Sequence, residues 1–190
     1  MGVCAAAAVP GGGYGFLGGR EDAATVDLAR GFSEGVRSEI TAASVDVRYL
    51  GQDFEAPTRT AAARATAKAM YREGAGVLFA AAGPSNCEIA EAASESDKLV
   101  IGYESNQNYL ERGNVVTSLN LRWDEVVFQE LESVACGRFR GGRYDVPLSS
   151  ELILYVVDDN NRQLIPAEAV KKIEAARQDM VAVRSGGDGR

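Results

Sequence analysis

Hydrophobic and polar positions change their period several times along the chain, and each change marks a predicted element. Residues 14–17 form a short apolar run followed by glycines, which is typical of a buried strand. A helix is predicted next, because large apolar residues recur every four positions on one face: Leu28, Phe32, Val36 and Ile40. In residues 44–51 apolar side chains alternate with polar ones, which predicts a second strand with one face buried.

The rest of the chain continues this alternation of strand and helix patterns. An alanine-rich helix is predicted to stop at Gly74, and Ser85 is predicted to cap the following helix. The remaining predictions are helices over 58–74, 86–96, 123–137 and 166–183, and strands over 76–83, 98–104, 114–122 and 151–157. We therefore expect an α/β fold with a doubly wound parallel sheet. Residues 1–12 are expected to be irregular and residues 184–190 to form a disordered tail.

Residues 13–18 read GYGFLG, which matches the dinucleotide-binding pattern G-x-G-x-x-G letter for letter. That pattern requires an acidic residue about 20 positions further on, at the end of the second strand. Here those positions hold Ser33 and Glu34, in the middle of the predicted helix. The glycines are therefore interpreted as structural, with Gly18 and Gly19 in a tight turn after the first strand. A Rossmann-like nucleotide-binding enzyme remains an alternative.

Charge and composition narrow the classes of function. Asp and Glu number 27 against 20 Lys and Arg, so the net charge is −7 and no clustered cations are present for a nucleic-acid backbone. The chain has no histidine, which removes Ser-His-Asp and Cys-His catalysis and ordinary zinc sites. Its three cysteines are isolated, and Asp158 and Asp159 are expected to form a turn. We therefore expect no catalytic residue, no metal site and no cofactor.

Ligands of open α/β sheets bind outside the carboxyl ends of the strands. The predicted strand ends are all polar or glycine-rich: 18–19, 52–54, 83–86 and 104–107. Glu104 offers a carboxylate that accepts two donors, and Phe54 offers an aromatic face. Each also has a structural interpretation, in which Phe54 packs on its own domain and Glu104 is solvated. Because these strands are expected to be neighbours, Phe54, Gly83 and Glu104 are predicted to lie together.

Six stretches follow one another at the intervals seen in one known family: GFLGG, ARGFSEGVRS, VRYLGQDFEAPTRTAAA, GVLFAAAGPSNCEIAEAA, LVIGYESNQ and VVTSLNLR. The chain resembles the second lobe of the basic membrane protein family of ABC-transporter solute-binding proteins, which includes purine nucleoside receptors. The resemblance covers roughly residues 14–183. It implies one lobe of a type I periplasmic-binding-protein-like fold, in which two lobes enclose the solute.

The resemblance also divides the chain into parts. Residues 13–122 correspond to the solute-binding lobe, and residues 123–183 to a helix-strand-helix segment that packs on or crosses to the first lobe. That first lobe is missing here, so a split or truncated gene product is expected. In the helix over 123–137 three apolar residues share a face: Val127, Leu131 and Val134. We expect this face to be covered by the segment around Ile173 and Met180, or to bind a first lobe on another chain or a second copy.

The positions that contact the ligand in this family can be matched one by one to residues of this chain. Together with the strand ends, they give six expected ligand-binding residues: Phe54, Gly83, Ser85, Asn86, Glu104 and Arg122. Glu104 stands for the first aspartate of the family's G-V-D-x-D-Q, which holds ribose hydroxyls, and Asn86 replaces the second glycine of AAG-x-x-G. The family's aromatic residue is matched by Phe54, one position late. The family's lysine falls on Leu121, for which Arg122 is the candidate substitute.

The resemblance implies partners and a location. The partners are a small-molecule solute and an ABC permease, and the location is extracytoplasmic with a membrane anchor. As written, residues 1–10 lack the positive region and the long apolar run of a signal peptide, which leaves the location cytoplasmic or unknown. A third possibility is an interaction or regulatory domain that has lost its ligand and keeps a protein-binding face.

Overall fold

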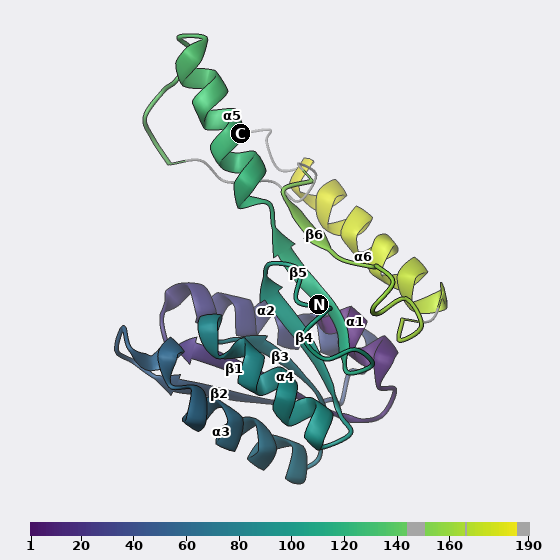
Figure 1. Cartoon of the computed structure of the whole chain (residues 1–190). Coiled ribbons are helices and arrows are strands. Elements are labelled where there is room, and N and C mark those ends of the chain that lie inside the picture. The colour runs from purple at the N-terminus through teal and green to yellow at the C-terminus, as the bar shows by residue number, and fades with distance from the viewer. Residues whose placement is uncertain (144–150, 166, 186–190) are drawn as a thin grey trace.

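The computed structural model describes residues 1–143, 151–165 and 167–185, with side chains as far as residue 180. Its centre is a six-stranded sheet in the order β2-β1-β3-β4-β5-β6 (Figure 1). The strands are β1 (Gly13–Arg20), β2 (Val45–Gly51), β3 (Ala75–Ala81), β4 (Leu99–Glu104), β5 (Val115–Leu121) and β6 (Ile153–Tyr155). Strands β1 to β5 are all parallel to one another, and β6 pairs antiparallel with β5. The prediction of a doubly wound, mostly parallel sheet is confirmed.

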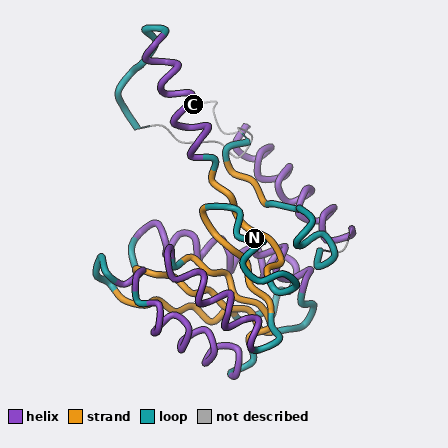
Figure 2. The backbone as a smooth tube through the Cα atoms, viewed as in Figure 1, coloured by secondary structure: helices purple, strands orange, loops and turns teal. Residues whose placement is uncertain are grey.

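Helices cover both faces of the sheet (Figure 2). They are α1 (Gly2–Ala8), α2 (Ala23–Glu39), α3 (Thr60–Arg72), α4 (Asn86–Glu95), α5 (Trp123–Ala135) and α6 (Ala167–Ser185), with short 3₁₀ turns at Ala56–Thr58 and Gly83–Ser85. Helices α1, α2 and α6 contribute to one buried core, and α3 and α4 contribute to the core on the opposite face. This arrangement leaves the edge formed by the strand ends free for a site.

The two central strands are buried on both faces. Phe16 of β1 and Phe79 of β3 belong to the core beneath α1 and α2, and their rings meet edge to face with centroids 5.6 Å apart. Their chain neighbours Leu17 and Leu78 belong to the core beneath α3 and α4. Complete burial of such side chains is worth about 1.5–3 kcal/mol each. Burial on both faces explains why these segments are continuous apolar runs and not alternating ones.

The first strand is longer than predicted. It was expected over 14–17, but it runs from Gly13 to Arg20, and Gly18 and Gly19 lie within the strand and not in a turn. The reason is packing: a Cβ atom on Gly18 would come within 2.6 Å of the Tyr49 ring, and one on Gly15 within 2.4 Å of Leu78. The glycines of GYGFLG therefore let neighbouring side chains lie across the strand. Close packing of these side chains therefore explains the glycine pattern of residues 13–18 without a bound dinucleotide.

The N-terminal segment is also more ordered than predicted. Residues 1–12 were expected to be irregular, but α1 spans Gly2–Ala8 and buries Cys4 and Ala5. The helix crosses α2 so closely that a Cβ atom on Gly2 would lie 2.1 Å from the carbonyl oxygen of Phe32. Small residues permit this approach, and seven residues are too few for a helical period to be recognised.

Helix α5 projects away from the body of the protein, as an arm that follows β5 (Figure 1). Five of its large apolar residues are more than half exposed: Trp123, Val127, Phe128, Leu131 and Val134. Of the two residues expected to cover them, Ile173 is buried in the core with α1 and α2, and Met180 is itself 55% exposed. Among the described residues, this face of α5 is therefore exposed, and its contact with a partner stays a prediction.

The end of the chain was expected to be a disordered tail from residue 184. Helix α6 continues to Ser185, and residues 186–190 lie outside the described residues. Among the described helices, none combines the length and apolar character needed to cross a bilayer.

Candidate functional site

A hollow of about 230 Å³ lies at the carboxyl ends of β1, β3 and β4. The strand order reverses between β1 and β3, and this switch point is where open α/β sheets bind ligands. The wall of the hollow includes Arg20, Asp22, Phe54, Gly83, Tyr103 and Glu104. The prediction that Phe54, Gly83 and Glu104 lie together at one edge of the sheet is therefore confirmed.

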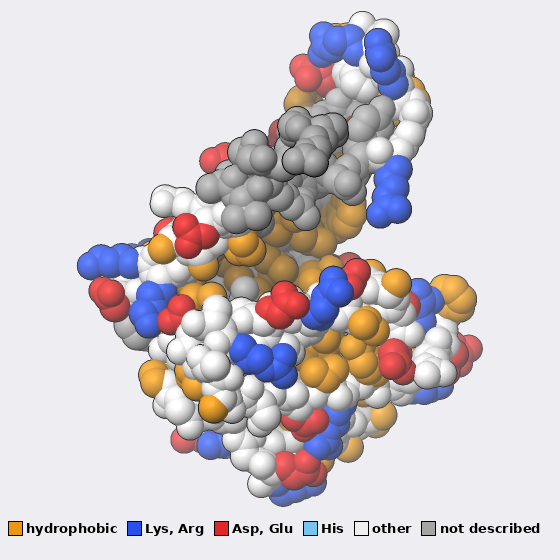
Figure 3. All heavy atoms as spheres, turned by 180° about the vertical axis from the view of Figure 1, so that it is seen from behind, with side chains coloured by type: hydrophobic (Ala, Val, Ile, Leu, Met, Phe, Trp, Pro, Cys, Tyr) orange, Lys and Arg blue, Asp and Glu red, His pale blue; other side chains and the backbone are white. Residues whose placement is uncertain are grey.

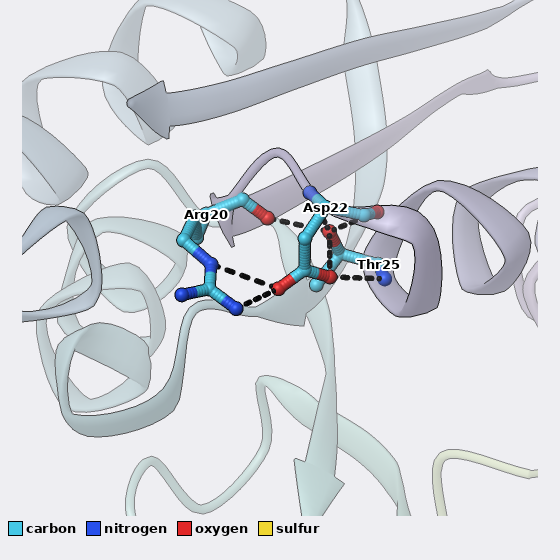
Figure 4. Close-up of polar contacts among 3 residues, drawn as sticks. All are labelled: Arg20, Asp22 and Thr25. Carbon is cyan, nitrogen blue, oxygen red and sulfur yellow. Dashed lines mark hydrogen bonds and ion pairs between the residues drawn. The ribbon is translucent and has the colours of Figure 1, made fainter. Parts of the chain in front are cut away.

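Arg20, Asp22 and Thr25 form a fixed polar group on one side of this hollow (Figure 4). The Nε and Nη2 atoms of Arg20 donate to Oδ2 of Asp22 at 2.9 and 2.6 Å. The amide of Thr25 donates to Oδ1 of Asp22 at 3.0 Å, and the amide of Asp22 donates back to the Thr25 hydroxyl oxygen at 3.1 Å. This reciprocal pair is a capping box that starts α2.

The electrostatics of this group follow from its hydrogen bonds. The Thr25 amide and then the Arg20 guanidinium lower the pKa of Asp22, so its carboxylate is ionised at neutral pH. The ion pair fixes the plane of the Arg20 guanidinium, whose Nη1 atom points away from Asp22 (Figure 4). A guanidinium held in this way can offer donors to a ligand without being reordered.

Phe54 stands beside this pair on the loop after β2. Its side chain is 88% exposed, and the guanidinium carbon of Arg20 lies 4.2 Å from the ring centroid. A cation over an aromatic face is worth about 0.5–1 kcal/mol at an exposed site. The contact holds the ring at the mouth of the hollow, where it presents apolar surface to solvent. The ring therefore packs on its own domain through Arg20 and leaves most of its surface open, so its contact with a ligand stays a prediction.

The opposite wall is formed by two residues with left-handed backbone conformations. Gly83 has φ +57° and Glu104 has φ +74°. Glycine adopts this conformation freely, but for glutamate a sparsely populated backbone conformation costs on the order of 1–3 kcal/mol. Such strain persists where surrounding contacts impose it, and it often accompanies a functional role. Here it turns the chain sharply at the end of β4, where Glu104 contributes to the hollow.

Ser85 and Asn86 shape the wall from behind. Ser85 was predicted to cap α4, but its hydroxyl is buried and donates to the carbonyl oxygen of Pro57 at 2.6 Å. Asn86, also buried, accepts from the amide of Ala82 at 2.9 Å and donates to Oε1 of Gln107 at 3.1 Å. Asn86 thus connects loops together with Gln107, which confirms the structural alternative to ligand contact that the sequence offered for both residues. Ser85 neither caps α4 nor lines the hollow.

Arg122 is placed elsewhere. It precedes α5 and pairs with Asp124 at 3.2 Å and Glu125 at 3.5 Å. The described residues that line the hollow do not include Arg122 or Leu121. The structure thus brings three of the six expected ligand-binding residues to the hollow and two directly behind it, and leaves Arg122 at the base of the arm.

Sequence reasoning missed Arg20, Asp22 and Thr25. The first strand was predicted to end at Leu17 with Gly18 and Gly19 in a turn, so the polar residues after the glycines were not expected at a strand end. A usable signal was present, because an Asp followed three residues later by Thr before an apolar period is typical of a helix start. If the helix is predicted to begin after Asp22, the strand before it can extend as far as Arg20, as the structure shows.

A second hollow, of about 710 Å³, lies between α2 and α6. Its lining is mostly apolar, with Leu28, Phe32 and Met180, and the Lys172–Glu39 ion pair joins the two helices. Its lining also carries the charged side chains of Asp27, Glu34 and Asp179, but it lies between two helices and not at the switch point of the sheet, where open α/β sheets bind ligands. The described residues also contain no group of three side chains that could hold a metal ion. The smaller hollow at the strand ends is therefore the better candidate site.

The fold is that of one lobe of a periplasmic-binding-protein-like protein. A solute-binding protein from Aeropyrum pernix superposes with a TM-score of 0.72 at 19% identity, covering 95% of this chain and 56% of that one. A transcriptional activator of the comK gene from Bacillus halodurans superposes with a TM-score of 0.78 at 18% identity, covering 100% of this chain and 62% of that one. At such identities the likeness shows the fold alone.

Residues 1–182 match the family described as ABC transporter substrate-binding protein PnrA-like, and the chain belongs to this family. Basic membrane protein D of Borreliella burgdorferi is 32% identical over 121 residues, covering 62% of this chain and 34% of that protein. Basic membrane protein A of Borreliella afzelii is 27% identical over 181 residues, covering 90% and 51%. The resemblance predicted from the six motifs is confirmed. The chain spans between a third and about half of the length of these relatives.

Proposed function

We propose that this chain is the solute-binding lobe of an ABC-transporter receptor, and that it binds a nucleoside-like or other small polar solute. The observation that carries the proposal is the arrangement of Phe54, the Arg20–Asp22 pair, Gly83 and Glu104 around one hollow at the switch point of the sheet. Members of its family are substrate-binding proteins. Binding without turnover requires none of the catalytic groups that the absence of histidine removes.

The chemistry of the hollow suits a ligand with a flat ring and neighbouring hydroxyl groups. The exposed ring of Phe54 supplies a stacking surface for a base. The carboxylate of Glu104 accepts two hydroxyl donors, as the family resemblance implies for ribose. Gly83 has no Cβ atom, so a ligand can approach the backbone closely at the start of the turn before α4. Arg20 adds donors for an acceptor atom of the ligand.

Calorimetric titration of the purified chain tests this function. Adenosine, guanosine, inosine, cytidine and uridine would be compared with NAD and NADP under the same conditions. We expect saturable one-to-one binding of at least one nucleoside and no saturable binding of the dinucleotides. Saturation by a dinucleotide alone would favour the Rossmann-like enzyme. The absence of any binding would favour an interaction domain that has lost its ligand.

We further propose that the exposed face of α5 is an interface. Val127, Leu131 and Val134 share this face and are 55%, 63% and 57% exposed. Hydrophobic side chains also line the notch between the arm and the body (Figure 3). Several exposed large apolar side chains on one helix face are typical of a site of protein contact. We infer that a first lobe covers the face in an assembled receptor, and that copies of this chain pair through it when no first lobe is supplied.

The family also implies an ABC permease as partner and an extracytoplasmic location, and we propose both for this chain. In that setting the lobe would deliver its solute to the permease, which requires reversible binding. The non-covalent contacts available in the hollow are suited to this.

A further inference from the structure

A chain of hydrogen bonds runs behind the candidate site, from the turn before α4 to the segment after β6. Oε1 of Gln107 accepts from Nδ2 of Asn86 at 3.1 Å and from the amide of Tyr103 at 3.3 Å. The amide of Gln107 donates to the Ser118 hydroxyl at 2.9 Å, and that hydroxyl donates to Oδ1 of Asn108 at 2.8 Å. Three segments of the chain, at Asn86, residues 103–108 and Ser118, are thus joined by side-chain contacts.

The chain of hydrogen bonds ends on one carboxylate, that of Asp158. Its Oδ2 atom accepts from Nδ2 of Asn106 at 3.0 Å and from Nδ2 of Asn108 at 3.2 Å. Its Oδ1 atom accepts from the amide of Asn160 at 2.8 Å. The donation from Asn106 is the main cause that lowers the pKa of Asp158, which keeps the carboxylate ionised. A carboxylate with this many donors is a strong anchor.

These hydrogen bonds matter for stability because most of the side chains that form them are buried. Asn108, Ser118 and Asn161 are each 0% exposed, and Asn86 is 2% exposed. A buried polar group that loses its partner bears a desolvation penalty, so the network favours one arrangement of all its members. Asn161 adds two further bonds, from Nδ2 to the carbonyl oxygens of Val116 and Val156 at 2.8 and 2.7 Å. The segment after β6 is thereby fixed to β5.

The loop held by this network begins at the strained residue of the site. Glu104, with φ +74°, lies between Tyr103, whose amide is held by Gln107, and Asn106, whose side chain is held by Asp158. A non-glycine residue in this conformation persists where the surrounding contacts impose it. Before Glu104, the amide of Tyr103 donates to Oε1 of Gln107. After Glu104, the side chain of Asn106 donates to the carboxylate of Asp158.

We propose that Asp158 is a positioning residue, which holds Glu104 in its left-handed conformation at the hollow through Asn106 and Asn108. The effect on solute binding rests on the proposed function, whereas the effect on the Glu104 backbone does not. Asp158 follows β6, the strand by which the chain returns from α5. It therefore also ties this returning segment to the loop after β4, which contains Asn106 and Asn108.

The first experiment measures the three-bond coupling between the amide and α protons of Glu104, which reports φ, in the ligand-free chain. In Asp158→Ala this coupling is expected to move toward the extended-strand value. Asp159→Ala is the matched control, because Asp159 is 93% exposed at its side chain and pairs with Arg162 on the surface. The control is expected to retain the wild-type coupling. A wild-type coupling at Glu104 in Asp158→Ala would overturn the proposal.

Asn106→Ala provides a second variant in case Asp158→Ala does not fold. Asn106 is exposed, and its truncation removes the 3.0 Å bond to Asp158 while the carboxylate remains. We expect the Glu104 coupling to move in the same direction by a smaller amount. An unchanged coupling in a folded Asn106→Ala protein would likewise count against the proposal.

The second experiment is a double-mutant cycle with adenosine as the probe. Asp158→Ala is expected to weaken adenosine binding about tenfold when Glu104 is present, and to have little further effect in a Glu104→Ala background. Equal losses in both backgrounds would show that Asp158 does not act through Glu104. If the wild-type chain does not bind adenosine, nucleoside binding is contradicted for this probe, and the coupling measurement alone decides the role of Asp158.

Discussion

Replacing Glu104 with alanine is expected to weaken nucleoside binding about 100-fold. A hydrogen bond to a charged group contributes about 1.5–3 kcal/mol, and a carboxylate that receives two hydroxyl donors loses both on truncation. A loss of about 3 kcal/mol corresponds to about two powers of ten in Kd. Calorimetric titration of wild type and variant with the same nucleoside measures the ratio.

Two control variants make the Glu104 result specific. Glu104→Gln keeps the length of the side chain and one acceptor, so an intermediate loss is expected. Glu34→Ala removes an equivalent charge at the hollow between α2 and α6 and is expected to leave Kd unchanged. If Glu34→Ala weakened binding and Glu104→Ala did not, the ligand would belong to the other hollow.

Replacing Leu131 with aspartate is expected to weaken self-association of the chain at least tenfold. Burying a leucine is worth about 1.5–3 kcal/mol, and the substitution also places a charge in the contact. Leu131 is 63% exposed and lies at the centre of the apolar face of α5, between Val127 and Val134. Sedimentation velocity over a range of concentrations gives the association constant for wild type and variant.

The matched control for Leu131→Asp is Gln129→Asp, on the opposite side of the same helix. It introduces the same charge without touching the apolar face, so wild-type association is expected. A wild-type chain that stays monomeric at high concentration, with Leu131→Asp unchanged in solubility, would contradict an interface on α5.

The sequence was sufficient to predict the layers of the fold, a sheet covered by helices. Alternation of apolar runs with helical periods correctly predicted the parallel sheet, because each strand and helix must bury its own apolar face. The boundaries of β1 were wrong at both ends, since glycine is a weak strand former and its role here depends on Tyr49 and Leu78, which lie far away in sequence. Helix α1 was missed because seven small residues show no helical period.

The residues of the candidate site were predicted only in part. Phe54, Gly83 and Glu104 were found because strand ends converge in this topology. Arg20 and Asp22 were missed through the misplaced end of β1. The left-handed conformation of Glu104 could not be predicted, because it depends on Asp158, which is more than fifty residues away in the chain. The hydrogen bond from Ser85 to Pro57 could not be predicted, because the two residues are 28 positions apart in the chain.

The most direct test of the proposed site is a map of amide chemical shifts in the isotopically labelled chain during titration with adenosine. The account predicts saturable shifts that cluster at residues 19–22, 54, 83 and 103–104, at the carboxyl ends of β1 to β4. Saturable shifts confined to residues 28–35 and 172–180, which border the hollow between α2 and α6, would contradict it.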